Sequence, residues 1–156
     1  MIKLYKKVDG RLQYHEAWLD EGVITEHWGA VGDRGLSREH PVPRRKSENA
    51  ALREVLKLAL DSGYEPIDDA QISIVLIEYE VDGFGTLSDL EKRHALEARM
   101  NETLGWTGVG HCDGGSIGSD SMEVCCMVVD AEIAKRVIEE DLKGTEFSDY
   151  SRIYEE

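Results

Sequence analysis

The sequence predicts an α+β protein with two domains, residues 1–67 and 71–156. The first half shows strand-like alternation followed by one helical pattern, and the second half alternates strand and helix patterns. Residues 1–68 hold 11 Lys/Arg and 12 Asp/Glu, which gives −1, whereas residues 69–156 hold 7 and 20, which gives −13. This asymmetry within a total of −14 indicates two modules with different surfaces.

The first domain is expected to begin with a small antiparallel sheet. Its four strands are predicted at residues 2–8, 11–19, 23–32 and 36–42. Asp9-Gly10 favours a tight hairpin because both turn positions need a positive φ, and Glu21-Gly22 marks the next turn. After a third turn at Gly32–Gly35, Pro41 and Pro43 end the strand region, since neither can donate to a β ladder.

One helix is expected to follow over residues 47–63 and to pack on this sheet. Ser47 is a suitable N-cap, and Gly63 stands where a helix C′ residue is common. The apolar stripe of an amphipathic helix is formed by Leu52, Val55, Leu56 and Ala59. The segment Glu65–Ala70, which combines one proline with three acids, is the predicted linker.

The second domain is expected to have the order β-α-β-β-α-β, the ferredoxin-like arrangement. Its strands are predicted at residues 71–81, 106–112, 122–129 and 150–154. Ser88 and Glu91 suggest a capping box that opens a first helix, which runs to about Leu104. The glycine-serine segment 113–121 is expected to be a loop, and Asp130 to cap a second helix that ends at Gly144.

Residues 28–35 (WGAVGDRG) resemble the signature of the WGR domain, in which Trp-Gly-Arg is followed by Val-Gly-x-x-Gly. The matching residues are Trp28, Gly29, Val31, Gly32 and Gly35. Ala30 stands where the family has its arginine. The resemblance covers about residues 1–67 and implies a binding module. In eukaryotic poly(ADP-ribose) polymerases this domain contacts DNA ends and neighbouring domains, with the Trp and Arg implicated. The second half resembles a ferredoxin-like domain of uncharacterised bacterial proteins.

Trp28 and a basic segment are the candidate contact residues of the first domain. Trp28 either packs in the core, which the large area of an aromatic favours, or presents a flat surface to a ligand. Residues 33–46 carry a local charge of +3. The basic residues of this segment are Arg34, Arg38, Arg44, Arg45 and Lys46. Three interpretations are open for these side chains. They contact nucleic-acid phosphates, they dock on a protein or on the acidic second half, or they form an ordinary solvated surface.

Other sites have weaker support in the sequence. A zinc site would have to use residues among His111, Cys112, Asp113, Cys125 and Cys126. Because neighbouring strand residues point to opposite faces, only a subset of these could converge, and neither a metal nor a disulfide framework is expected. The segment 113–121 lacks the lysine of a P-loop, and no nucleophile motif is present, so no cofactor and no catalysis are expected.

The sequence therefore favours a non-catalytic, two-domain binding protein whose WGR-like half engages a protein or, weakly, a nucleic acid through residues 1–67. One alternative is an acidic inhibitor or immunity-type protein that covers a basic target with its second half. Another is a hydrolase that uses the glycine-rich segment and Asp113. The N-terminal residues turn polar too early for a signal peptide, and no run is long enough for a membrane helix, so a bacterial-type cytoplasmic protein is expected.

Overall fold

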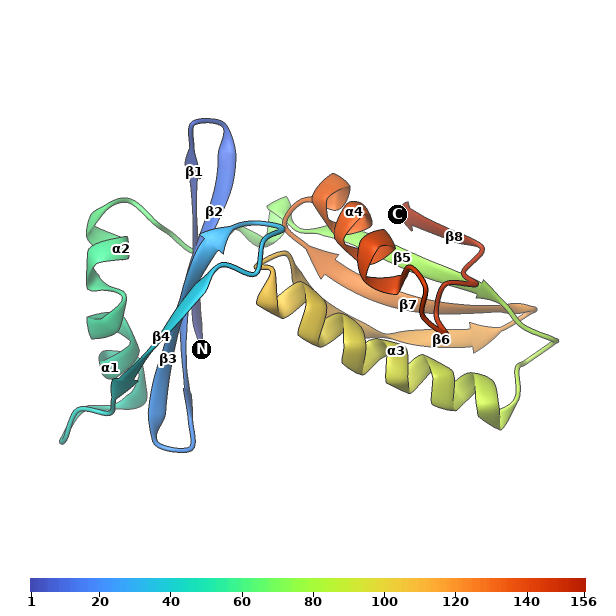
Figure 1. The fold of residues 1–156 in the computed structure, drawn as a ribbon, viewed down its shortest axis with the longest axis horizontal. Helices are drawn as coiled ribbons and strands as arrows, with labels where there is room; N and C mark the ends of the chain where they lie inside the picture. The colour runs from blue at the N-terminus through green and yellow to red at the C-terminus, as the bar shows by residue number, and fades with distance from the viewer. The chain divides into compact units, whose positions relative to one another are not determined.

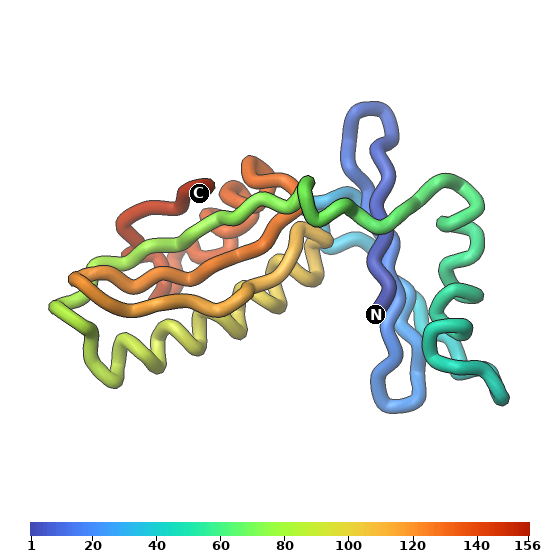
Figure 2. Tube along the Cα trace, turned by 180° about the vertical axis from the view of Figure 1, so that it is seen from behind, coloured from blue at the N-terminus to red at the C-terminus, as the bar shows by residue number.

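The computed structural model describes all 156 residues, which form two compact units. The first unit is Met1–Asp68 and the second is Asp69–Glu156. Each unit contains one four-stranded antiparallel sheet and two of the four α-helices, so the chain is an α+β protein (Figures 1 and 2). None of the helices combines the length and the apolar composition that crossing a bilayer requires.

The sheet of the first unit is a simple meander in the order β1-β2-β3-β4. Its strands are β1 (Ile2–Val8), β2 (Arg11–Asp20), β3 (Val23–Ala30) and β4 (Leu36–Pro41). The first hairpin turns at Asp9 and Gly10, whose φ angles of 51° and 79° confirm the expected left-handed turn. Glu21 and Gly22 repeat this geometry between β2 and β3.

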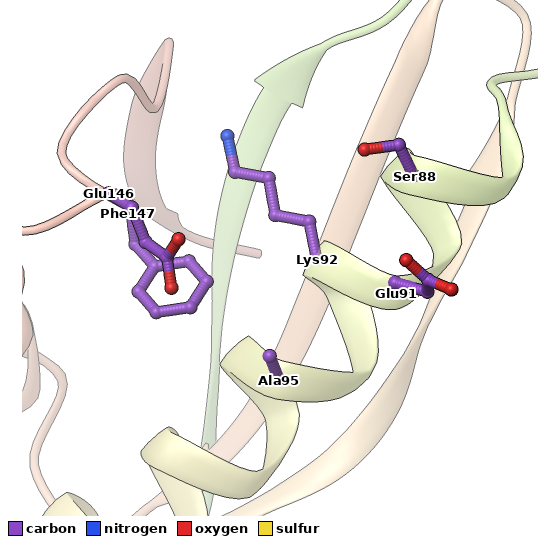
Figure 3. Close-up of a pocket in the computed structure, with 6 residues that line it drawn as sticks. All are labelled: Ser88, Glu91, Lys92, Ala95, Glu146 and Phe147. Atoms are coloured by element: carbon purple, nitrogen blue, oxygen red, sulfur yellow. The ribbon is translucent and has the colours of Figure 1, made fainter.

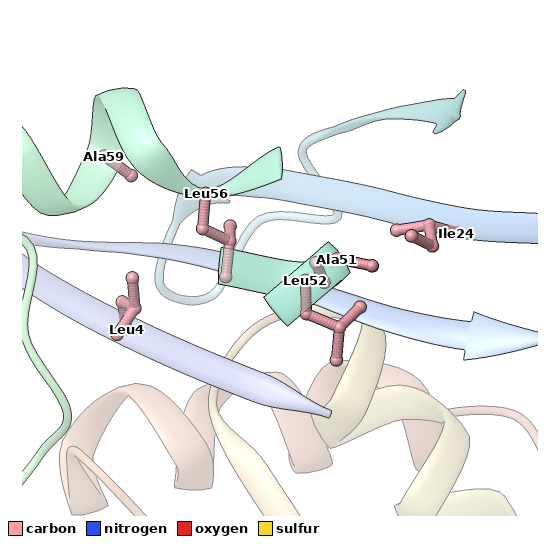
Figure 4. Close-up of a cluster of buried hydrophobic side chains, with 7 residues drawn as sticks. Leu4, Ile24, Ala51, Leu52, Leu56 and Ala59 are labelled. Carbon is pink, nitrogen blue, oxygen red and sulfur yellow. The ribbon is translucent and has the colours of Figure 1, made fainter. Parts of the chain in front are cut away.

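One face of this sheet holds the apolar core of the unit (Figure 4). The buried side chains are Leu4, Ala17, Ile24, Ala51, Leu52, Leu56 and Ala59. The strands supply three of them. The others come from two short helices, α1 (Glu48–Val55), with Ser47 as its N-cap, and α2 (Lys57–Asp61), and from Leu56 between these helices. The prediction of a single helix was wrong. The chain is interrupted at Leu56 (φ −89°, ψ 6°), but the apolar periodicity continues across it, so the pattern could not reveal the break.

The second unit has the element order β-α-β-β-α-β and a sheet in the order β6-β7-β5-β8. After a short 3₁₀ turn, η1 (Asp69–Gln71), its elements are β5 (Ser73–Glu80), α3 (Leu87–Trp106), β6 (Gly110–Gly118), β7 (Ser121–Val128), α4 (Ala131–Leu142) and β8 (Arg152–Glu155). Helix α3 packs on β6 and β7, helix α4 packs on β5 and β8, and the two helices contact each other. They therefore form one layer over the sheet (Figure 1).

The start of α3 differs from the prediction. Thr86 is the N-cap: its hydroxyl accepts a hydrogen bond from the Asp89 backbone N–H, and the Asp89 carboxylate accepts from the Thr86 N–H at 2.7 Å. The predicted capping box, Ser88 and Glu91, has the same spacing as the observed one, Thr86 and Asp89. The sequence pattern alone therefore did not distinguish the two capping boxes. The bend at Gly85 (φ 76°), which precedes Thr86, selects the earlier position.

The segment expected to be a long loop is mostly strand. Strand β6 continues to Gly118, and only Ser119 and Asp120, with φ angles of 45° and 69°, form the turn. Gly115 serves close packing. A side chain on Gly115 would overlap the carbonyl oxygen of Glu123 on β7 and press on Arg93 of α3. The residues that look like a flexible loop are therefore an edge strand packed tightly under a helix, with a bulge between Cys112 and Gly115.

Candidate binding surface on the first unit

The residues that match the WGR signature form the end of β3 and the turn that follows it. Gly29 lies on β3, and Gly35 (φ 65°) closes the turn directly against it. A side chain on Gly29 would lie 2.8 Å from the Cα of Gly35, and one on Gly35 would overlap the Trp28 carbonyl oxygen. The Tyr14 hydroxyl reaches into this turn and donates to the Asp33 carbonyl at 2.9 Å. The two glycines are thus required by close backbone approach.

Trp28 lies between side chains from both neighbouring strands. His15 of β2 stacks on it, with ring centroids 5.7 Å apart and an angle of 29° between the planes. The guanidinium of Arg38 on β4 lies 5.4 Å from the centre of the indole. The indole is half-buried. Trp28 therefore has features of both predicted roles, because it packs against its neighbours and also reaches the surface.

A buried carboxylate organises this side of the sheet. Glu26 is 4% exposed, yet it lies on the same face as Trp28 and the apolar core. Nη2 of Arg38 donates to it at 2.8 Å, and the Nε2 atoms of His15 and His40 lie 2.8 and 2.6 Å from its oxygens. Burial by itself raises the pKa of Glu26, but these hydrogen bonds outweigh burial and hold the pKa below its usual value.

Sequence reasoning missed Glu26, His15 and His40 as members of one cluster. Glu26 lies on the Trp28 face of β3, where the alternation is otherwise apolar. The register supplies the missing information, because Glu26 pairs with Arg38, and His40 and His15 lie diagonally beside it on the flanking strands. One sequence signal would have revealed the cluster. It is a carboxylate on the core-facing side of a strand, with His or Arg at the positions beside it on both neighbouring strands.

The basic residues of the predicted patch do not converge on one point. The Arg38 side chain remains 62% exposed although its guanidinium contacts both Glu26 and Trp28. The Arg34 side chain is exposed, and its carbonyl oxygen lies 2.5 Å from Nε2 of His27. The remaining three, in the exposed loop after β4, are Arg44, Arg45 and Lys46. Lys46 forms an ion pair with Glu54 of α1.

Strand β4 is an open edge. All of its residues except His40 are exposed, and no backbone hydrogen bond reaches it from its outer side. The opposite edge, β1, is closed in part, because the backbone groups of Tyr5 and Glu65 exchange hydrogen bonds of 2.8 and 3.0 Å. Leu36, at the start of β4, is 66% exposed. An edge with free backbone groups and an exposed apolar residue is suited to adding a strand from another chain.

The residues considered for zinc are separated by the fold. Cys112 and Cys126 are buried and face each other across β6 and β7, whereas His111 and Asp113 are exposed. A hydrogen bond between the two thiols lowers the pKa of Cys112 and raises that of Cys126. All three cysteines are free, and no three His, Cys, Asp or Glu side chains are arranged to hold a metal ion.

A hollow of about 340 Å³ opens beside α3 in the second unit (Figure 3). It is lined by Ser88, Glu91, Lys92, Ala95, Glu146 and Phe147. The Lys92 ammonium is already bound to Asp149 at 2.7 Å and lies 4.5 Å from the centre of the Tyr79 ring. The hollow therefore offers no uncommitted cation to a ligand.

Comparison with known proteins finds no matching family model, no matching curated protein and no matching solved structure. Of the six residues predicted to bind a partner, the structure brings Trp28 and Arg38 into contact and places them beside the open edge of β4.

Substituting Trp28 with alanine is expected to destabilise the protein by about 2 kcal/mol, less than for a fully buried indole because part of the ring already faces water. Urea unfolding of the full chain measures this, and Trp28→Phe, which keeps a ring between His15 and Arg38, should lose about half as much. An unchanged unfolding midpoint in Trp28→Ala would show that the indole is displayed rather than packed.

Proposed function

We propose that the protein is a non-catalytic binding protein whose WGR-like first unit engages a partner protein. The contact surface would consist of the open edge of β4, the Trp28–Arg38 pair and the basic loop after β4. The proposal depends most on β4, since it is an exposed strand with unpaired outer backbone groups. Arg34, Arg44 and Arg45 border this edge and would favour an acidic segment of the partner.

The proposed WGR relationship is supported by the steric role of its glycines. Gly29 and Gly35 each tolerate no side chain, and Val31 between them is 1% exposed. These constraints explain why the turn requires Gly29 and Gly35, although Ala30 stands in place of the family's arginine. We also propose that the second unit belongs to the ferredoxin-like class, which its strand order β6-β7-β5-β8 and element order support.

A protein partner is favoured over nucleic acid by the surroundings of Trp28. A base stacks on a free aromatic face, whereas His15 and Arg38 approach this indole from the strands on either side of it. Glu26 binds Arg38 and Glu54 binds Lys46, which leaves three basic side chains of the patch for phosphates. Three phosphate contacts give a salt slope of only about −2.7, so duplex binding would be weak.

A second copy of the chain fits β4 poorly. Two β4 strands related by a two-fold axis normal to the sheet would pair residues that face the same side. The registers that pair most of the strand then place Arg38 opposite Arg38, or Glu39 opposite Glu39. Like charges directly opposite each other destabilise a strand pair. A different protein that contributes an extended acidic segment is therefore the better match.

The experiment compares capture of proteins by immobilised full-length chain from nuclease-treated lysate of its host cells. Leu36→Ser and the double variant Arg44→Glu, Arg45→Glu should each lose the captured partner. The matched controls, Leu58→Ser on α2 and the double variant Lys7→Glu, Arg53→Glu, change exposed residues away from β4 and should keep it. Equal capture by all variants would contradict the proposed surface.

The alternative partner is tested directly with a labelled DNA duplex. Fluorescence anisotropy near physiological salt should show no tight binding, with a dissociation constant above about 1 μM. A nanomolar constant that weakens in the Arg44→Glu, Arg45→Glu variant would overturn the choice of a protein partner and identify the basic loop as a nucleic-acid interface.

A further inference from the structure

The loop between β5 and α3 and the first residue of α3 each display an apolar side chain to solvent. Phe84 is 85% exposed and Leu87 is 72% exposed, in a segment that reads VDGFGTL over residues 81–87. A phenylalanine that projects almost completely into water forgoes about 2 kcal/mol of the stabilisation that its burial would bring. No other aromatic side chain of the chain is among its exposed large hydrophobic residues.

This loop is held in place by its backbone. Gly83 (φ 60°) and Gly85 (φ 76°) flank Phe84, and the Gly85 N–H donates to the Asp82 carbonyl at 3.0 Å. Asp120, in the turn between β6 and β7, binds the loop twice. Its Oδ1 accepts from the Gly83 N–H at 2.8 Å, and its own N–H donates to the Gly83 carbonyl at 2.7 Å.

The fixed geometry makes Phe84 a preorganised anchor. A side chain on Gly85 would lie 2.7 Å from Cγ2 of Ile117, so the backbone of the loop is fitted against β6. The capping box of Thr86 and Asp89 then ties the loop to the start of α3. A binding loop that is already ordered loses little conformational entropy when a partner docks.

The surroundings of Phe84 are uniformly acidic. Residues 80–91 contain four acids and no basic residue. Beside the loop lies an open hollow of about 670 Å³ lined by Glu80, Val81, Asp82, Thr86, Ser88, Asp89 and Asp120. The nearest cation along the chain, Lys92, is bound to Asp149. An exposed aromatic side chain with polar groups at its border resembles a protein interface, in which an apolar centre is surrounded by a polar rim.

We propose that the Phe84 loop, residues 81–87 with the acidic side chains around it, is a docking site for a basic protein. The partner would offer an apolar pocket for Phe84 and Leu87, bordered by Lys or Arg side chains that meet Glu80, Asp82 and Asp120. This site does not depend on β4 or on the WGR-like character of the first unit. The site would also serve the alternative function, that of an acidic inhibitor or immunity-type protein, as the surface that contacts the basic target.

Charge separates this occupant from the others. A nucleic acid or an anionic membrane surface is repelled by the four acids around the loop. The same loop of a second copy is repelled for the same reason, since residues 69–156 carry a net charge of −13. A basic protein surface gains from both the acidic ring and the apolar anchor, so association would be fast at low salt and slower as salt screens the ring.

The test uses the full chain with the photoreactive residue p-benzoylphenylalanine at position 84, expressed and irradiated in its host cells. The control chain carries the same residue at position 58, where Leu58 is 84% exposed on the first unit. A protein crosslinked from position 84 and not from position 58 is then purified, and its binding to the unmodified chain is measured at two salt concentrations. We expect a basic protein whose affinity falls as salt rises.

The decisive variant is Phe84→Ser, which should weaken binding of that protein by about 30-fold or more, whereas Leu58→Ser and Leu36→Ser should leave it unchanged. Phe84→Ser should also unfold at the same urea concentration as the parent, because the ring is exposed. A crosslink to a second copy of this chain, to lipid or to nucleic acid, the absence of any crosslink specific to position 84, or a Phe84→Ser variant that binds equally well would overturn the proposal.

Discussion

Replacing Gly35 with alanine is expected to lower the free energy of unfolding by about 3–5 kcal/mol. Two costs combine at this position. The backbone has φ 65°, which strains any residue with a Cβ. The added methyl group would also overlap the Trp28 carbonyl oxygen and lie 2.5 Å from the Tyr14 hydroxyl oxygen. The Trp28 carbonyl belongs to the segment with the WGR-like signature, and the Tyr14 hydroxyl reaches into its turn. The turn itself would therefore have to open.

The control for this variant is Gly22→Ala in the hairpin between β2 and β3. Gly22 has φ 79°, but a methyl group added there would meet no atom within 4 Å, so the substitution carries the backbone cost alone. Urea unfolding should show a loss of about 1 kcal/mol for Gly22→Ala and a several-fold larger loss for Gly35→Ala. Equal losses would mean that left-handed φ, and not the close approach to Tyr14, explains the glycine.

The turns and most strands of the fold could be predicted from the sequence because they depend on local chemistry. Asp9-Gly10 and Glu21-Gly22 adopt a left-handed backbone whatever surrounds them, and alternation along the strands follows directly from the pleat. Ser47 was likewise confirmed as an N-cap, with its side chain accepting from the Ala50 N–H. Such features need only three or four neighbouring residues.

The features that sequence reasoning missed depend on residues that are distant in the chain. Glycines in β6 suggested a loop, and only the approach of Glu123 and Arg93 shows why Gly115 is needed in a strand. Phe84 was not predicted as a contact residue, because its exposure is a property of the folded surface and not of its neighbours in the sequence. Of the candidate contact residues, Trp28 and Arg38 meet, and whether they bind a partner stays a prediction. Glu26, the carboxylate that positions Arg38, lies opposite it because of the strand register, which periodicity does not define.

That carboxylate gives the second large effect: Glu26→Ala is expected to destabilise the protein by about 3 kcal/mol. Hydrogen bonds to a charged group contribute about 1.5–3 kcal/mol each, and the contribution of Arg38 is reduced because its side chain is largely exposed. His15, His40 and Arg38 would all lose their acceptor, and Trp28 would lose the cation held against it. Glu39→Ala, on the exposed side of the same edge strand, should change stability by less than about 0.5 kcal/mol. If Glu26→Ala lowered the free energy of unfolding no more than Glu39→Ala does, the Glu26 cluster would contribute nothing to the stability of the fold.

The pH dependence of unfolding isolates the charge of Glu26. Its pKa in the folded protein lies below the usual 4.5, so the ionised form stabilises the fold above that pH, and this contribution is lost as the pH falls through the folded-state pKa. Glu26→Gln keeps the shape and one acceptor but has no proton to gain. The difference in unfolding free energy between parent and Glu26→Gln should therefore be present above about pH 4.5 and shrink as the pH falls below that value. A difference that stays constant down to about pH 3 would mean that the Arg38 contact acts through packing, and that the negative charge of Glu26 is not what holds the Trp28–Arg38 pair in place.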